Sequence, residues 1–263
     1  MVSMSSKLNV AIAQWIPVIG DKEKNALRIV EGMRKGAKAD ADIVIFPELF
    51  LTGYSCRDYF HNLAEDPNSR IFRQIVRESN EYNVGVVFGA PIRDKDRKII
   101  YNSLVFINGD NIGVYNKINL ANFGPFEEKM QFAHGDDAKL FNIGNIKFAP
   151  VICYDAFFPE LLKSYALGGA HVIIHISASP YFSKQAFETI VPARAVENTV
   201  FYIFCNYVGV ERGLVFWGGS RVISPRGYTI VKAKEFEEDF ISCTINLDEL
   251  RIARFLRPTI RDS

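Results

Sequence analysis

Cysteine and histidine are scarce in this chain of 263 residues, with four of each. The four cysteines lie far apart and form no Cys-x-x-Cys pair, so the sequence predicts neither a disulfide framework nor a metal site. Unpaired cysteines are typical of reducing compartments, and we therefore expect a cytoplasmic protein.

Long apolar runs, basic stripes and linkers are also missing. No uninterrupted apolar stretch approaches the roughly 20 residues that cross a bilayer, and the N-terminal segment has no secretion-signal pattern. The 31 Lys and Arg residues nearly balance the 30 Asp and Glu residues, without a basic stripe that would bind nucleic acid. Neither a membrane nor a nucleic acid is an expected partner. No Pro-, Gly- or Ser-rich segment divides the chain, which predicts one domain over residues 1–263.

The chain alternates between strand-like and helix-like patterns. Apolar residues at helical spacing predict helices over 21–38, 68–82, 159–168, 184–197 and, more briefly, 247–255. Apolar segments predict strands over 9–15, 41–46, 84–90, 146–153, 171–176, 200–205, 219–223 and 240–246, with a strand–turn–strand over 102–117. About ten strands in one domain tend to split into two packed sheets covered by helices. We therefore expect an α/β fold of four layers, an α-β-β-α sandwich with mixed sheets.

Three reactive side chains each follow a predicted strand. Cys153 ends the apolar segment 146–152, Glu48 follows 41–47, and Lys117 follows 112–116. Each has an ordinary alternative, because free cysteines are usually buried apolar residues, lysines are usually solvated and a glutamate often caps a helix. All three at strand ends together favour a catalytic site, since a strand end holds a side chain rigidly at the edge of a sheet.

A thiol, a carboxylate and an ammonium together suit the hydrolysis of an amide or a nitrile. The thiol attacks the substrate carbon, and the carboxylate moves the proton from the thiol to the leaving amine. The ammonium and a backbone N–H stabilise the oxyanion. This chemistry requires no metal and no organic cofactor. A Cys–His pair is less favoured, because no histidine lies in a comparable position.

The segments that surround these residues resemble the nitrilase, or carbon–nitrogen hydrolase, superfamily over almost the whole chain. They are Phe46–Tyr54, Tyr115–Lys117 and Cys153–Glu160, followed by 169–174, 194–198, 206–209, 218–220 and 224–227. The resemblance implies that Cys153 is the nucleophile, Glu48 the general base and acid, and Lys117 the oxyanion stabiliser. It also implies that Glu128 orders the site, that the N–H of Tyr154 completes the oxyanion hole, and that the protein forms a homodimer or a higher homo-oligomer.

The substrate class is less sharply defined by the resemblance. Segments 51–58, 120–129, 176–181 and 206–220 are similar to the glutaminase domain of NAD synthetase, but no Ser-Gly-Gly-x-Asp-Ser pyrophosphatase loop occurs in the sequence. That glutaminase often has an arginine for the substrate carboxylate where this chain has Lys184-Gln185, and an acid where it has Tyr154.

We therefore expect an amidase that acts on a small amide. A glutaminase-like or ω-amidase-like supplier of ammonia to a separate synthetase, and a non-catalytic interaction subunit, are the alternatives. The expected substrate-binding residues are Tyr54, Phe123, Tyr154 and Ser179, with Phe126, Tyr181 and Trp217 as further aromatic candidates.

Overall fold

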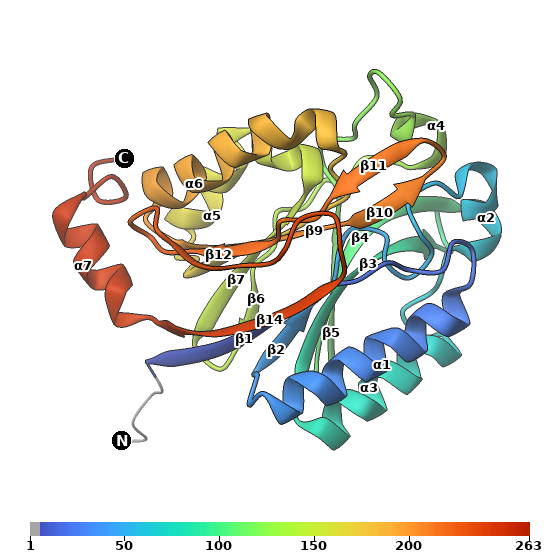
Figure 1. Ribbon diagram of the computed structural model, residues 1–263, viewed down its shortest axis with the longest axis horizontal. Coiled ribbons are helices and arrows are strands. Elements are labelled where there is room, and N and C mark those ends of the chain that lie inside the picture. The colour runs from blue at the N-terminus through green and yellow to red at the C-terminus, as the bar shows by residue number, and fades with distance from the viewer. Residues whose placement is uncertain (1–5) are drawn as a thin grey trace.

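Two six-stranded sheets pack against each other in the computed structural model, which describes residues 6–263 (Figure 1). The first sheet has the order β14-β1-β2-β3-β4-β5 and the second the order β13-β12-β9-β8-β7-β6. The strands of the first sheet are β1 (Lys7–Gln14), β2 (Ile43–Ile45), β3 (Gly85–Asp94), β4 (Ile99–Asn108), β5 (Asn111–Asn116) and β14 (Asp239–Asn246). Those of the second are β6 (Phe141–Ile143), β7 (Ile146–Ile152), β8 (Val172–Ser177), β9 (Phe201–Asn206), β12 (Arg221–Ile223) and β13 (Thr229–Lys232).

Helices cover the outer faces of both sheets. The helices α1 (Lys22–Lys38) and α3 (Arg70–Tyr82) lie side by side against the first sheet, and α5 (Pro159–Leu167) and α6 (Lys184–Asn198) lie against the second (Figure 1). The predicted α-β-β-α sandwich is therefore confirmed. The smaller elements are α2 (Phe60–Leu63), α4 (Glu128–Gln131), α7 (Asp248–Leu256), the hairpin of β10 (Val208–Glu211) and β11 (Leu214–Trp217), and 3₁₀ helices at 57–59, 153–157 and 181–183. Among residues 6–263, none of the helices has the length and apolar character needed to cross a bilayer.

The central strands are apolar on both faces because each face is covered. In β2, Ile43 and Ile45 pack into the core between the sheets, whereas Val44 and the following Phe46 pack toward α1 and α3. In each sheet three central strands are parallel, and parallel strands with both faces covered are typically continuous apolar runs. This is why a strand such as β2, with the sequence Ile43-Val44-Ile45, shows no polar alternation.

Local signals set the ends of the helices. Asp21 accepts a hydrogen bond from the N–H of Lys24 at the start of α1, and Ser69 accepts one from Phe72 at the start of α3. Asn83 ends α3 in the left-handed conformation that asparagine tolerates. The five predicted helices agree with the structure to within two residues at each end.

The sequence prediction missed four short strands, which are β6, β10, β11 and β13. They have three or four residues each, and several of their side chains are exposed, so they lack an apolar run that would mark them. The predicted strand over 219–223 begins only at Arg221, because Gly218 and Gly219 both adopt positive φ angles of 67° and 62°.

A glycine lets the segment after β2 lie directly on β3. The N–H of Gly89 donates to Pro47 and its carbonyl accepts from Leu51, so that the turn carrying Glu48 is held against the strand. A Cβ at position 89 would lie 2.0 Å from the backbone nitrogen of Leu49 and 2.6 Å from the Cα of Glu48. Only glycine fits at this close approach of two backbones.

Gly89→Ala should therefore displace the Glu48 turn. We expect unfolding free energy to fall by about 1–3 kcal/mol, as in other overpacked sites, and amide hydrolysis to fall at least tenfold. Chemical denaturation and ammonia release measure these two effects. The matched control is Gly168→Ala, whose added Cβ has its nearest contact at 3.3 Å; equal effects of the two substitutions would contradict this account.

Candidate active site

The carboxylate of Glu48 lies in a turn just beyond β2 and is fully buried. Its Oε1 accepts hydrogen bonds from Lys117 Nζ at 2.8 Å and from Asn102 Nδ2 at 2.7 Å. Its Oε2 accepts from the backbone N–H of Ala178 at 2.7 Å, at the end of β8. These three donors come from β4, from the residue that follows β5 and from the residue that follows β8, and together they fix the position of the carboxylate.

The ammonium of Lys117 lies between two carboxylates. It donates to Oε1 of Glu48 and to Oε1 of Glu128, at 2.8 Å in each case, and its side chain is fully buried. Burial alone acts to lower the pKa of Lys117, but Glu128 and Glu48 outweigh it and raise the pKa well above its usual value. The lysine is therefore a fixed positive charge, as the sequence predicts, and not a proton acceptor.

Glu128 completes this cluster from the start of α4. Its Oε1 also accepts from the hydroxyl of Tyr54 at 2.8 Å, and its Oε2 accepts from the N–H of Ala121 at 2.9 Å. Burial raises the pKa of Glu128, Lys117 lowers it and Glu48 raises it further. The structure thus brings together the second glutamate, the lysine and the first glutamate in the arrangement expected from the sequence.

The thiol of Cys153 lies beside this cluster at the carboxyl end of β7. Cys153 begins a 3₁₀ helix and has a φ of 45°, which a non-glycine residue adopts only where the surroundings impose it. The thiol is close enough to Glu48, Lys117 and Glu128 for all three charges to act on its pKa. Such a sharp, strained strand-to-helix turn presents a nucleophile at the edge of a sheet.

Lys117 acts to lower the pKa of this thiol, but its effect is outweighed. Burial and the carboxylate of Glu48 raise the pKa of Cys153 well above the ordinary thiol value, and Lys117 offsets this only in part. The resting thiol is therefore protonated, and we do not expect the rapid alkylation by iodoacetamide that a low-pKa thiol shows.

A third buried carboxylate, that of Asp155, holds the turn around the thiol. Asp155 Oδ2 accepts from the Tyr115 hydroxyl at 2.8 Å and from the N–H of Ile152 at 3.2 Å. Its Oδ1 accepts from the N–H and the side-chain amide of Asn119, at 2.8 and 3.0 Å. Asp155 therefore ties the segment that carries the thiol to the segment that carries Lys117, and the two functional groups are positioned relative to each other.

A histidine does lie behind the nucleophile, but it does not form a Cys–His pair. Nδ1 of His175 is hydrogen-bonded to the hydroxyl of Tyr202 at 2.8 Å, and its ring packs against Phe187 and Phe204. Burial lowers the pKa of His175 to about 3, while its interaction with the backbone of Cys153 opposes this shift. A neutral imidazole with so low a pKa is a poor general base.

The predicted substrate-binding residues lie on different sides of the cluster. The rings of Phe123 and Tyr154 are in contact, with centroids 4.9 Å apart, and Phe123 also packs edge-on against Phe126. Tyr54 contacts Phe126 from the other side and reaches Glu128. These four rings form an aromatic wall next to the catalytic cluster.

The remaining predicted side chains are less available to a substrate. Ser179 is fully buried, and its hydroxyl accepts from the indole N–H of Trp217 at 3.4 Å. Trp217 is itself in the core, and Tyr181 is exposed and packs on Phe236. Lys184, at the place where the glutaminase often has an arginine for the substrate carboxylate, donates to Glu235 at 3.0 Å and so already has a carboxylate partner.

Sequence reasoning missed four contributors to the cluster. They are Asn102, Asp155, Ser177 and the backbone N–H of Ala178. A signal existed for Asn102 and Asp155, since a polar residue inside an otherwise apolar buried segment needs a partner. The hydroxyl of Ser177, which has no other hydrogen-bond partner among residues 6–263, acts on the Cys153 thiol to lower its pKa.

Comparisons with known proteins agree with this geometry. The carbon–nitrogen hydrolase family model matches residues 9–255. A glutamine-dependent NAD(+) synthetase from Thermotoga maritima is 35% identical over 94% of this chain, but the match covers 44% of the relative. A nitrilase from Pyrococcus abyssi is 32% identical and covers 94% of this chain and 93% of its own length.

A solved structure supports the fold. Nit3 from Saccharomyces cerevisiae, a member of branch 10 of the nitrilase superfamily, has a TM-score of 0.87 at 26% identity and covers 96% of this chain and 94% of its own. The chain spans less than half the length of the two NAD synthetases that it matches at 35% identity.

The substitution Asp155→Asn should show whether Asp155 positions the thiol and the lysine or only stabilises the fold. The amide keeps two of the hydrogen bonds but turns a donor toward Tyr115 and Ile152, which costs about 1–3 kcal/mol of stability. We expect kcat to fall at least tenfold while KM changes less than threefold, because the thiol and the lysine lose their alignment. Steady-state kinetics and denaturation test this, with the exposed Asp137→Asn as control; a change confined to stability would contradict a positioning role.

Proposed function

We propose that this chain, which belongs to the carbon–nitrogen hydrolase family, is a thiol amidohydrolase that cleaves the C–N bond of a small amide through a thioester. The observation that carries the proposal is the buried Lys117 ammonium, held at 2.8 Å by both Glu48 and Glu128 beside the Cys153 thiol. A structural ion pair needs neither a thiol nor a second carboxylate, whereas amide hydrolysis uses all of these groups.

The first half-reaction forms the thioester. As the sulfur of Cys153 attacks the carbonyl carbon, Glu48 takes the thiol proton, and the oxyanion develops next to Lys117 and the N–H of Tyr154. Glu48 then gives its proton to the amide nitrogen. The C–N bond breaks, ammonia or an amine leaves, and the acyl group remains on the sulfur.

The second half-reaction returns the enzyme to its resting state. Water attacks the thioester carbon, and Glu48 takes a proton from that water. The C–S bond breaks, the carboxylic acid leaves and the proton returns to the sulfur. The sum is an amide plus water giving an acid plus ammonia or an amine, and no step requires a metal or an organic cofactor.

The walls of the site favour a small neutral amide. Phe123, Phe126 and Tyr154 are apolar near the thiol, and Lys184 is already paired with Glu235. The alternative is a glutaminase-like or ω-amidase-like supplier of ammonia to a separate synthetase, which the 35% identity to NAD synthetases supports. We also propose a homodimer or higher homo-oligomer, which sedimentation will test.

Ammonia release from a panel of amides should reveal the substrate class. The panel contains butyramide, glutamine, an α-keto-acid ω-amide, a carbamoyl amine and a nitrile. We expect release from at least one amide and none with Cys153→Ala, because no other buried thiol lies beside Lys117. Equal release by Cys153→Ala would refute the nucleophile, and silence of the wild-type protein across the panel would count against the proposed function.

Glu48→Gln should block the reaction before the thioester forms. The other carboxylate near the thiol, that of Glu128, already accepts from Lys117, Tyr54 and Ala121. We therefore expect activity to fall at least 10³-fold, within the range that general bases contribute. Intact mass spectrometry after incubation with substrate should show no added acyl group. A stable acyl adduct would mean that Glu48 serves only to activate water.

A further inference from the structure

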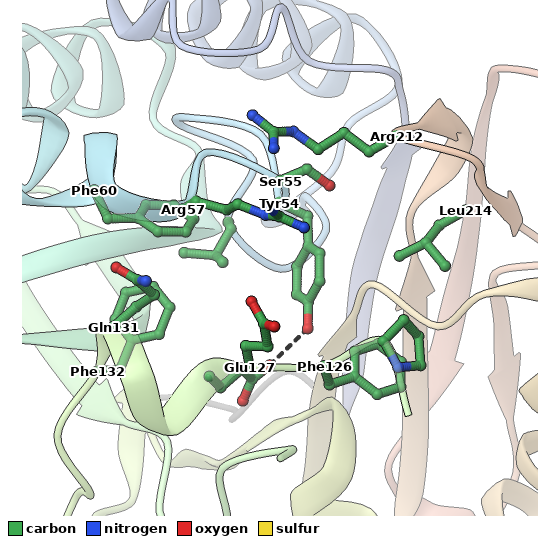
Figure 2. A pocket seen from close by; sticks show the side chains of 13 residues that line it. Tyr54, Ser55, Arg57, Phe60, Phe126, Glu127, Gln131, Phe132, Arg212 and Leu214 are labelled. Atoms are coloured by element: carbon green, nitrogen blue, oxygen red, sulfur yellow. Dashed lines mark hydrogen bonds between the residues drawn. The ribbon is translucent and has the colours of Figure 1, made fainter. Parts of the chain in front are cut away.

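A small cavity opens on the side of the catalytic cluster that faces the β10–β11 hairpin. Its volume is about 140 Å³, and its inner wall is made by Tyr54 and Glu128. Apolar side walls come from Phe60, Phe126 and Leu214. In Figure 2 the ring of Tyr54 stands in the cavity, and the dashed line marks its hydrogen bond to Glu128.

Two arginines stand at this cavity from separate parts of the chain. Arg57 comes from the loop that follows Glu48, and Arg212 comes from the turn between β10 and β11 (Figure 2). Both are exposed, and within residues 6–263 neither guanidinium takes part in an ion pair or a hydrogen bond. Two guanidinium groups without partners, placed beside one cavity with apolar walls, are available to bind an anion.

The backbone at both arginines is unusual. Arg57 has a φ of 47° and Arg212 a φ of 46°, in the left-handed region that costs an L-residue roughly 1–2 kcal/mol. The hairpin turn accounts for the angle at Arg212, since Gly213 follows at 82°, but glycine or asparagine is the usual choice there. The chain thus has arginine at two left-handed positions on the same cavity.

Glu211 holds these two segments together. It is buried, and its Oε2 accepts from the N–H of Ser55 at 2.8 Å while its Oε1 accepts from the hydroxyl of Tyr207. The loop with Arg57 is therefore bound to the hairpin with Arg212, and the two backbone segments that carry the arginines are fixed beside the same cavity before any ligand arrives. Pre-organisation of this kind lowers the cost of binding.

The other charges at the cavity leave it open to an anion. The carboxylate of Glu128 accepts from Lys117, Tyr54 and Ala121, whereas that of Glu127, which also lines the cavity, has no such partners among residues 6–263. Gln131 adds an amide. Arg57 and Arg212 therefore face two carboxylates at this cavity, and that of Glu128 already has Lys117 as its partner.

We propose that this cavity binds a carboxylate between Arg57 and Arg212, with the short carbon chain of the ligand against its apolar walls. Planar guanidinium groups bind carboxylates in a forked geometry, and the small volume suits a short organic acid. The carboxylate has two possible sources. One is the far end of an amide substrate whose amide group reaches past Tyr54 to Cys153, and that source rests on the proposed function. The other is a separate short-chain acid that binds beside the active site.

Titration calorimetry tests the binding itself and does not depend on activity. Succinate is titrated into the Cys153→Ala protein, and then into the same protein with Arg57→Met and Arg212→Met. We expect the double substitution to weaken succinate binding at least tenfold, whereas Arg34→Met, on the exposed side of α1, leaves it unchanged. Lysine at both positions should retain part of the affinity. No binding, or equal binding without the two arginines, would overturn the proposal.

Hydrolysis then distinguishes the two sources. Succinamate and levulinamide have the same chain length but end in a carboxylate and a methyl ketone. A substrate carboxylate predicts at least a tenfold higher kcat/KM for succinamate, and loss of this preference in the double variant. A separate acid predicts no preference, but added succinate changes levulinamide hydrolysis by the wild-type protein and not by the double variant. If neither amide is hydrolysed, that result counts against the proposed function. The calorimetry does not depend on hydrolysis and still shows whether the cavity binds a carboxylate.

Discussion

The buried ammonium of Lys117 is the interaction on which the rest of the site depends. Burying one charge is costly, and removing a single partner from a buried pair leaves the other charge uncompensated. Here one lysine compensates two carboxylates, and every remaining carboxylate oxygen accepts from another donor, either a backbone N–H or a side-chain amide or hydroxyl. The cluster is therefore stable only as a whole, and each of its members comes from a different segment of the chain.

The two stacked sheets are what bring those segments together. Glu48 follows β2 of the first sheet, whereas Cys153 follows β7 and Ala178 follows β8 of the second. The hydrogen bond from the Ala178 N–H to Glu48 crosses from one sheet to the other, and Asp155 links the β7 end to the segment after β5. Ligands of α/β proteins bind at the carboxyl ends of strands, and in this fold the ends of two sheets form a single site.

The sequence predicts the parts of this protein that follow from local pattern. Helices with caps such as Asp21 and Ser69, and apolar strands such as β2 and β8, are visible because periodicity and burial mark them. Glu48, Lys117, Cys153 and Glu128 are found by position and by family resemblance. The sequence does not reveal contacts between residues that are far apart in the chain. Examples are the hydrogen bonds of Asn102 and Asp155 and the pairing of Lys184 with Glu235. It also does not reveal the burial that raises the pKa of the thiol.

In the proposed mechanism, that raised pKa changes how Cys153 must be activated as the nucleophile. Losing the thiol proton to solvent would place a new negative charge next to Glu48 and Glu128 in a buried site, which is unfavourable. Transfer to Glu48 instead moves the existing negative charge from oxygen to sulfur, so the total charge around Lys117 stays the same. Burial opposes this internal transfer far less than it opposes ionisation. The three hydrogen bonds that hold Glu48 are thus part of the activation of Cys153, because they keep the proton acceptor beside a thiol that stays protonated until substrate arrives.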